Sequence, residues 1–298
     1  MGKGTLKEEI ERICMEIIEE RYKQNTNEGM DLDYDKREVA FNDKHEKGVV
    51  TDLSKLPYRY SVYIGLPGFE RVTAYSILRR TDLVVYQNGG KSIPQDGNPL
   101  IYAFKNEKGW KFRSKADKKS FVDVIKSSTN KLSQYYPIGF SIMIPSANNL
   151  NSWFASVIKN YCKNATICNT FLRKLSANEV LAMAKQPNSD IMKLPDKNEA
   201  KKFIDMLTKD VEKMNEKGGI FRSHLLSDGD LRDYIANTMT YSGDDQISKL
   251  SCYINGKDIF LIDDTISKVR SIKEAIGIIT TCFYPKSISI LTLFSEYN

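Results

Sequence analysis

From about residue 117 onwards the chain alternates between helix and strand patterns, and this alternation limits the fold more than any other feature. A helical pattern near 117–133 is followed by an apolar strand pattern at 139–144, and the same succession recurs to the C-terminus. Strands separated by helices are typical of βαβ units, in which the strands run parallel. The sequence therefore predicts an α/β fold with a parallel sheet flanked by helices.

The elements after residue 139 give this prediction its detail. The clearest is an amphipathic helix over 150–161, in which apolar side chains recur at helical spacing without a miss. A mostly helical insertion is expected at about 175–250, and its clearest helix begins at Asp196. The other expected elements are strands at 139–144, 165–172, 258–262 and 287–294 and a helix at 271–283.

The first 116 residues have a different pattern. An amphipathic helix is expected over 5–23, and the polar stretch 24–56 is expected to be a long loop. Strand patterns separated by turns follow at 58–64, 83–86, 100–104 and 110–112. We therefore divide the chain into 1–116, an N-terminal helix with a small antiparallel β region, and 117–298, the α/β domain with its helical insertion.

Composition excludes several classes of protein. The chain has 298 residues, of which 41% are hydrophobic and 28% charged, and its net charge is only +6, which is ordinary for a globular protein. Two histidines and five cysteines without a C-x-x-C pair argue against a zinc site or a disulfide framework. No apolar run reaches the ~20 residues of a membrane span, and the N-terminus lacks the apolar region of a signal peptide. We expect a cytoplasmic protein that does not interact with membranes.

The segment after Ile262 holds the residues best suited to chemistry. Asp263 and Asp264 follow an apolar strand, and open parallel sheets bind ligands at the carboxyl ends of their strands. A hydroxyl-rich loop then leads into a helix, whose first amide groups attract a phosphate, and Lys268 or Arg270 adds positive charge. Two acids accept hydrogen bonds from vicinal ribose hydroxyls or help to hold Mg²⁺. The segment predicts a sugar-phosphate site; the alternative is a strand-end loop whose acids cap the next helix.

Residues 253–264, Tyr-Ile-Asn-Gly-Lys-Asp-Ile-Phe-Leu-Ile-Asp-Asp, resemble the signature of type I phosphoribosyltransferases. In that family a hydrophobic strand ends in two acids, and a loop rich in Thr, Gly and Ser holds the 5′-phosphate of phosphoribosyl diphosphate. The resemblance covers about 117–295 and is specific over 253–295. It implies a phosphoribosyltransferase-like fold and a glycosyltransferase of nucleotide metabolism, which transfers ribose 5-phosphate to a base, nucleotide or nucleic acid. The sequence does not identify that acceptor.

The resemblance also implies roles for individual residues. Asp263 and Asp264 match the catalytic acids that contact the ribose hydroxyls, and they are candidate Mg²⁺ ligands. The implied phosphate-binding residues are Thr265, Ser267, Lys268, Arg270 and Ser271. The implied diphosphate-binding residues are Ser146, Ala147, Asn148, Arg173 and Lys174. For these last residues an asparagine helix cap and a solvated basic pair are the structural alternatives.

Two residues of the phosphate loop depart from the family pattern and leave other functions open. Val269 stands where the family has glycine, and Arg270 where it has Ser or Thr. A β-branched residue resists the positive φ that glycine allows. One alternative is therefore a non-catalytic sensor or regulator that binds a phosphoribosyl ligand. Another is an effector that targets nucleic acid or nucleotides through the basic stretch 105–119, which contains Trp110 and Phe112; a solvated hairpin face is the structural alternative.

Other features of the chain are given structural interpretations. The segment 87–92 lacks the first glycine of a P-loop and is expected to be a hairpin turn. His224 is the only histidine of the insertion, and we assign it a structural role. Homo-oligomerisation is left open by the sequence.

Overall fold

The computed structural model describes residues 30–33, 35–41, 58–79, 83–88, 91–96, 99–146, 149–235, 238–266 and 269–295. The helix expected at 5–23 lies outside these ranges. So does most of the loop expected at 24–56, but the described part of it forms two short strands, β1 and β2, which pair as an antiparallel hairpin. These strands span Met30–Asp33 (β1) and Glu38–Phe41 (β2).

A six-stranded sheet with the order β3-β4-β13-β12-β8-β9 forms the centre of the molecule. Its edge strand β3 runs antiparallel to β4, and every other neighbouring pair is parallel. The strands span Tyr58–Leu66 (β3), Phe69–Arg79 (β4), Phe140–Met143 (β8), Thr166–Cys168 (β9), Asp258–Ile266 (β12) and Ser287–Ser295 (β13). The expected α/β fold with a mostly parallel sheet is confirmed, and strands β3 and β4 bring residues 58–79 into the same sheet as the C-terminal part.

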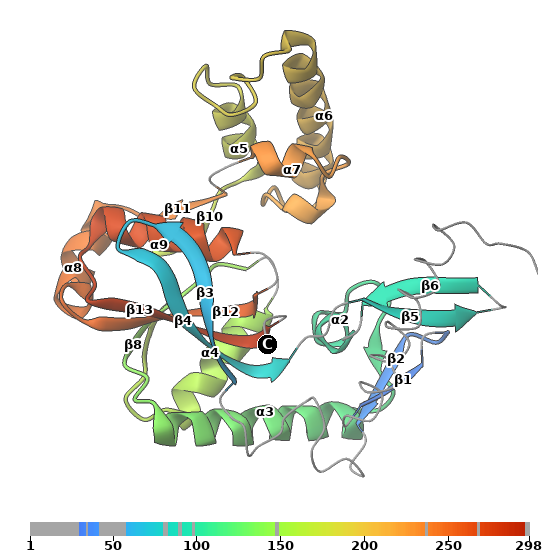
Figure 1. Ribbon diagram of the computed structural model, residues 1–298, viewed down its shortest axis with the longest axis vertical. Helices are drawn as coiled ribbons and strands as arrows, with labels where there is room; N and C mark the ends of the chain where they lie inside the picture. Colours follow the sequence, from blue (N-terminus) through green and yellow to red (C-terminus); the bar gives the residue numbers. More distant parts are fainter. Residues whose placement is uncertain are drawn as a thin grey trace, which may run out of the picture.

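Helices cover both faces of this sheet (Figure 1). On β12, Phe260 and Ile262 point into the core with α3 and α4, whereas Ile259 and Leu261 point into the core with α9, as the alternation of side chains in a strand requires. The helices span Lys115–Tyr135 (α3), Leu150–Tyr161 (α4), Asp244–Ile254 (α8) and Arg270–Cys282 (α9). The helices expected near 117–133, 150–161 and 271–283 are therefore confirmed.

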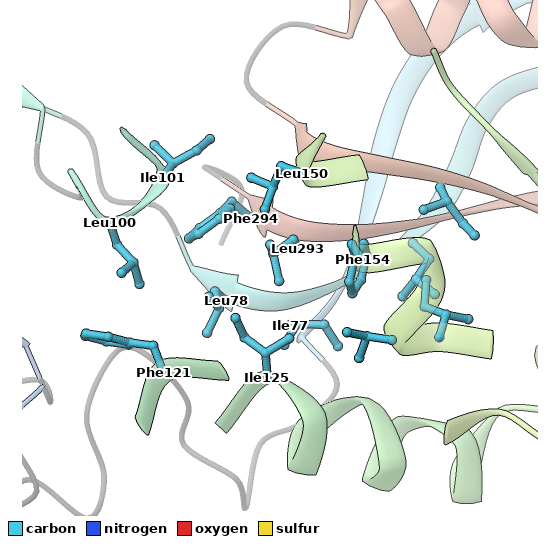
Figure 2. Close-up of a cluster of buried hydrophobic side chains, with 14 of the residues drawn as sticks. Ile77, Leu78, Leu100, Ile101, Phe121, Ile125, Leu150, Phe154, Leu293 and Phe294 are labelled. Carbon is cyan, nitrogen blue, oxygen red and sulfur yellow. The ribbon is translucent and has the colours of Figure 1, made fainter. Parts of the chain in front are cut away.

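A short helix, α2 at Leu100–Lys105, stands where the sequence predicted a strand. That prediction is wrong because a five-residue apolar run fits both a buried strand and one buried turn of helix. Leu100 and Ile101 reach into the core between the sheet and α3, where they lie near Phe121 and Leu78 (Figure 2). The helix ends at Asn106, whose left-handed backbone stops it immediately after Lys105.

The expected insertion folds largely as a separate helical lobe, which we define as α5, α6, the 3₁₀ helix η1 and α7 (Figure 1). These elements span Ala177–Ala184 (α5), Lys197–Glu216 (α6), Ser223–Leu225 (η1) and Leu231–Tyr234 (α7). The chain enters and leaves the lobe through β10 (Leu172–Lys174) and β11 (Met239–Tyr241), which pair antiparallel. The strand expected at 165–172 is thus divided into β9 and β10.

Two further small sheets complete the described structure. Strand β7 (Lys111–Phe112) joins β2, and β5 (Leu83–Asn88) pairs with β6 (Lys91–Asp96). The β5–β6 hairpin confirms that the segment 87–92 is not a P-loop. Within the described ranges, none of the helices has the length and apolar character needed to cross a membrane.

Candidate functional site

Strand β12 places Asp263 and Asp264, which we call the acid pair, inside the sheet and not in the loop expected after Ile262. The strand continues to Ile266, while its neighbour β8 ends at Met143 and pairs with β12 only as far as Ile262. Beyond that point β12 is paired on its β13 side. The acid pair therefore lies at the carboxyl end of the parallel strands, where β12 projects past β8.

The connections around β8 and β12 reverse direction at this edge. From β8 the chain passes through α4 to β9, on one side of β8, and later returns to β12 on its other side. Helices α4 and α9, which follow β8 and β12, pack on opposite faces of the sheet. Ligands of open α/β sheets bind at such a reversal of strand order. The acid pair stands on one of the two strands that form it.

Asp263 is held in place by hydrogen bonds from three directions. Its Oδ1 accepts from the Nδ2 of Asn151 at 3.0 Å and from the backbone N–H of Asp264 at 2.9 Å. Ser271 Oγ lies 3.5 Å from Oδ2, a long contact. Asn151 Nδ2 also donates to the carbonyl of Ile144, while the buried Oδ1 of Asn151 has no hydrogen-bond partner. The network fixes the carboxylate and leaves a buried acceptor beside it.

Two lysines from different elements face the acid pair. Lys105, at the end of α2, places Nζ 2.8 Å from Asp264 Oδ2, and the two side chains are only 14% and 8% exposed. Lys174, at the end of β10, is half-buried; burial lowers its pKa, while the charges of Asp263 and Asp264 act in the opposite direction. The acids and these lysines thus bring two carboxyl groups and two amino groups within electrostatic range of one another.

Burial sets the protonation of Asp263. Removal from water, followed by the nearby charge of Asp264, raises the pKa of Asp263 to about 7, against 3.8 for an exposed aspartate. A carboxyl group whose pKa is higher in the folded than in the unfolded state favours folding while it is protonated. That contribution is complete below the unfolded pKa and is lost as the pH rises through about 7.

We therefore expect the free energy of unfolding to fall by about 1.4 kcal/mol between about pH 6 and about pH 8, through this one carboxyl group. Urea unfolding at several pH values measures the slope. Because other groups titrate in this range, the test is the difference between the native protein and Asp263→Asn, which lacks the ionisable group. Equal slopes for the two proteins would show that Asp263 is already ionised at pH 6.

The residues expected to bind the 5′-phosphate take different positions. Ser271 lies next to Asp263, whereas Thr265 stands on β12 with a buried hydroxyl that lacks a hydrogen-bond partner. Arg270 points elsewhere, since its guanidinium donates to the carbonyls of Arg232 and Asp233 at the end of α7. Ser267 and Lys268 lie outside the described residues. The structure thus brings Ser271 to the acid pair and does not bring Arg270 there.

Some of the residues expected to bind diphosphate lie near the acid pair, and others do not. Ser146 follows β8 at the same edge of the sheet, while Ala147 and Asn148 lie outside the described ranges. Arg173 is exposed and forms a two-pronged ion pair with Glu179 on α5, with distances of 3.1 and 2.8 Å. Only Lys174 of the basic pair faces the acid pair.

Helix α9 fastens the return of the helical lobe to the sheet. Besides the contacts of Arg270, Glu274 accepts from the backbone N–H of Met239 at 2.7 Å and from the hydroxyl of Thr238 at 2.9 Å. Burial raises the pKa of Glu274. The two side chains are one helical turn apart, so the start of α9 links the acid pair to the lobe.

Both aromatic rings of the basic stretch 105–119 contribute to packing. Trp110 is 7% exposed, and Phe112 is half-buried against Phe104 and Phe121. Lys105, the first residue of this stretch, belongs to the cluster around the acid pair. His224 stands in η1, and its side chain lies outside the described structure.

Sequence reasoning missed Lys105 and Asn151. Both lie far from the acids in the chain, and neither belongs to a motif. Asn151 had one signal: it is a polar residue in the first turn of a helix that follows a strand, where side chains meet the ligand edge. Lys105 stood out only as the first residue of the basic stretch 105–119, which gave no sign of a place beside the acids.

The cluster does not fit a resident divalent cation. Among the residues that the structure describes, no three His, Cys, Asp or Glu side chains group closely enough to hold a metal ion. Asp264 is already paired with Lys105, and Lys174 lies within electrostatic range of both acids. Mg²⁺ binds through carboxylates and other oxygen ligands, and these positive charges oppose it.

A cavity of about 250 Å³ lies in the helical lobe, apart from the acid pair. Its walls come from α5, from the loop that follows it and from the end of α7. Its lining includes apolar Val180 and Met183, polar Gln186 and Asn188, and Tyr234. The lining is therefore part apolar and part polar.

Comparison with known proteins gives no match to a family model, to a curated protein sequence or to a solved structure.

Proposed function

We propose that the chain is a phosphoribosyltransferase-like protein that binds phosphoribosyl diphosphate at the carboxyl edge of its sheet and transfers ribose 5-phosphate to an acceptor. One observation carries the proposal: a buried pair of adjacent acids stands on the central strand β12, where the strand connections reverse direction beside β8. Buried carboxylates oppose folding unless they are paired. Such groups in a crevice mark a candidate functional site.

The free hydrogen-bonding capacity around Asp263 suits a diol. Carboxylates and the carbonyl oxygen of an amide accept hydrogen bonds, and Asn151 Oδ1 lacks a donor. The 2′- and 3′-hydroxyls of a ribose are neighbouring donors, and they match the Oδ2 of Asp263 together with the Oδ1 of Asn151. A buried acceptor without a partner has a free-energy cost that such a ligand removes.

The positive groups suit phosphates. Lys105 and Lys174 supply two ammonium groups beside the acids, and lysine binds phosphate as a compact charge with three donors. Helices α4 and α9 begin at the same edge, and their N-cap residues Asn149 and Val269 make no side-chain cap hydrogen bond. The positive ends of the two helix dipoles favour an anion.

Transfer at this site needs little chemistry from the protein. The bond between C1 of the ribose and the diphosphate oxygen breaks, a bond from C1 to the acceptor forms, and the acceptor releases its proton to solvent. Positive charge develops on the ribose ring during this step, so an ionised carboxylate nearby lowers the barrier.

A non-catalytic sensor is the second candidate, and the start of α9 favours it. Val269 packs into the core on the α9 side, and Arg270 binds carbonyls of the lobe. Neither residue therefore takes over phosphate binding from the glycine and the Ser or Thr that the phosphoribosyltransferase family has at these positions. The same contacts link this loop to the lobe. In this version, binding of the phosphorylated ribose changes the position of the lobe, and no bond is broken.

Calorimetric titration with phosphoribosyl diphosphate, together with an assay for diphosphate release, tests both candidates. The enzyme is expected to bind the ligand and to release diphosphate when a mixture of purine and pyrimidine bases and nucleosides is supplied. Binding without release identifies the sensor. Ribose 5-phosphate and diphosphate are tested separately as controls for each half of the ligand. No heat of binding with any of the three would contradict the proposed function.

A further inference from the structure

The charge cluster leads to an inference that rests on the proposed function and goes beyond it. We infer that Lys105 and Lys174 occupy the role that a divalent cation has in binding a diphosphate ester, so that this protein binds its phosphoribosyl ligand without Mg²⁺. Lys105 forms an ion pair with Asp264 at 2.8 Å, Lys174 lies near enough for the charges of both acids to act on it, and no three His, Cys, Asp or Glu side chains of the described residues group closely enough to hold a metal ion.

The position of Lys105 is built into the core. Leu100, Ile101 and Ala103 of α2 are at most 3% exposed, and Phe104 stacks on Trp153 of α4 with its ring centroid 5.8 Å away. Lys105 follows these residues directly and has little freedom to leave Asp264. A lysine held in this way is a fixed charge, unlike a surface lysine that forms an occasional ion pair.

Lys174 comes from a different part of the fold. It belongs to β10, whose pairing with β11 runs from Leu172 to Lys174, so its backbone is fixed by the two-stranded sheet at the base of the lobe. Burial lowers the pKa of Lys174, the charges of Asp263 and Asp264 raise it, and those of Lys105 and Arg222 lower it further, so the side chain lies within electrostatic range of these groups. The second ammonium therefore comes from an element unrelated to α2.

The four charges leave no net negative charge to attract a cation. Two carboxylates alone would draw a divalent ion, but each added ammonium cancels one of them, and like charges at short range repel. A diphosphate ester brings its own negative charge and is attracted by the same lysines. An ammonium has three donors, so Lys105 can keep its bond to Asp264 and still donate to a phosphate oxygen.

Metal binding by the protein alone gives the first test. Mn²⁺, a spectroscopic substitute for Mg²⁺, is added to the native protein and the free ion is measured by electron paramagnetic resonance. The native protein is expected to bind no more Mn²⁺ than Lys111→Met, a matched control that removes an exposed lysine paired with Glu38 at 3.2 Å. Lys105→Met is expected to bind about tenfold more tightly than either. If the native protein binds Mn²⁺ and Asp263→Asn abolishes this binding, the inference is overturned.

Ligand binding gives the second test. The dissociation constant of phosphoribosyl diphosphate for the native protein is measured in EDTA and in excess Mg²⁺, and the two values are expected to agree within about threefold. A constant more than about tenfold lower in Mg²⁺ would overturn the inference. Both measurements, in EDTA and in Mg²⁺, use the native protein, so their outcome does not depend on the folding of Lys105→Met.

The failure of this inference is distinct from failure of the proposed function. Binding of the ligand only in Mg²⁺ leaves the proposed function intact and removes the role of the lysines. Absence of ligand binding in both buffers contradicts the proposed function. Even if the ligand does not bind, the Mn²⁺ experiment remains informative. Weak Mn²⁺ binding by the native protein and strong binding by Lys105→Met would still support the inference that lysines take the place of a metal at the acid pair.

Discussion

Replacing Lys105 by methionine is expected to lower the free energy of unfolding by about 3 kcal/mol. The methionine keeps the length and apolar stem of the side chain but removes the ammonium from Asp264, whose carboxylate is 8% exposed. Removing one partner of a buried pair leaves the other charge without compensation, and this effect exceeds the value of the pair itself. Urea unfolding followed by circular dichroism measures the change.

A double-mutant cycle separates this effect from a loss of packing. Asp264→Asn in the Lys105→Met background removes the stranded charge, so the double variant is expected to regain about half of the lost stability or more. Lys111→Met removes the ion pair between this exposed lysine and the half-buried Glu38 and is expected to change stability by less than about 1 kcal/mol. Equal effects of Lys105→Met and Lys111→Met would mean that Asp264 is well hydrated in solution.

Sequence reasoning was most successful where a local pattern determines the structure. The helix at α4 follows from its apolar spacing, and the strands β12 and β13 follow from short apolar runs between turns. The element α2 shows the limit, because five apolar residues do not distinguish a strand from a helical turn. Tertiary packing determines that this segment is a helix, because Leu100 and Ile101 enter the same core cluster as Phe121 and Leu78 (Figure 2).

The residues of the candidate site also differ in how far the sequence could predict them. The acids could be found because they are neighbours in the sequence and follow a recognisable strand. Their partners could not, since Lys105 and Asn151 lie more than a hundred residues away and reach the acids only through the fold. Arg270 shows the converse: its place in the loop suggested a phosphate ligand, but carbonyls at the end of α7 capture its guanidinium. Contacts of that kind have no local sequence signal.

Asp263 combines a cost to folding with the best position for binding. Burial raises its pKa to about 7, so ionising it in the folded protein opposes stability above that pH. A neutral asparagine of the same shape would avoid this cost and keep the hydrogen bonds from Asn151 and from the backbone of Asp264. A residue retained against stability in this way is expected where function requires the charge.

Asp263→Asn is therefore expected to weaken binding of phosphoribosyl diphosphate by about 100-fold while leaving the fold intact. A hydrogen bond to a charged group contributes about 1.5–3 kcal/mol, and tenfold in affinity corresponds to about 1.4 kcal/mol. Above pH 7 the variant is expected to be more stable than the native protein, since it lacks the buried charge. Calorimetric titration and urea unfolding on the same samples measure both changes.

The matched control is Asp258→Asn on the same strand. Asp258 is exposed at the start of β12, where it accepts from Ser287 Oγ at 2.6 Å and pairs with Lys286 at 3.3 Å, at the edge opposite to the acid pair. The substitution at 258 is expected to leave ligand affinity unchanged within about twofold. Weaker binding caused equally by both substitutions would point to a general effect of charge on β12, and native affinity in Asp263→Asn would remove this carboxylate from the binding site. Opposite changes in stability and affinity at 263 alone would show that its charge is kept for the ligand.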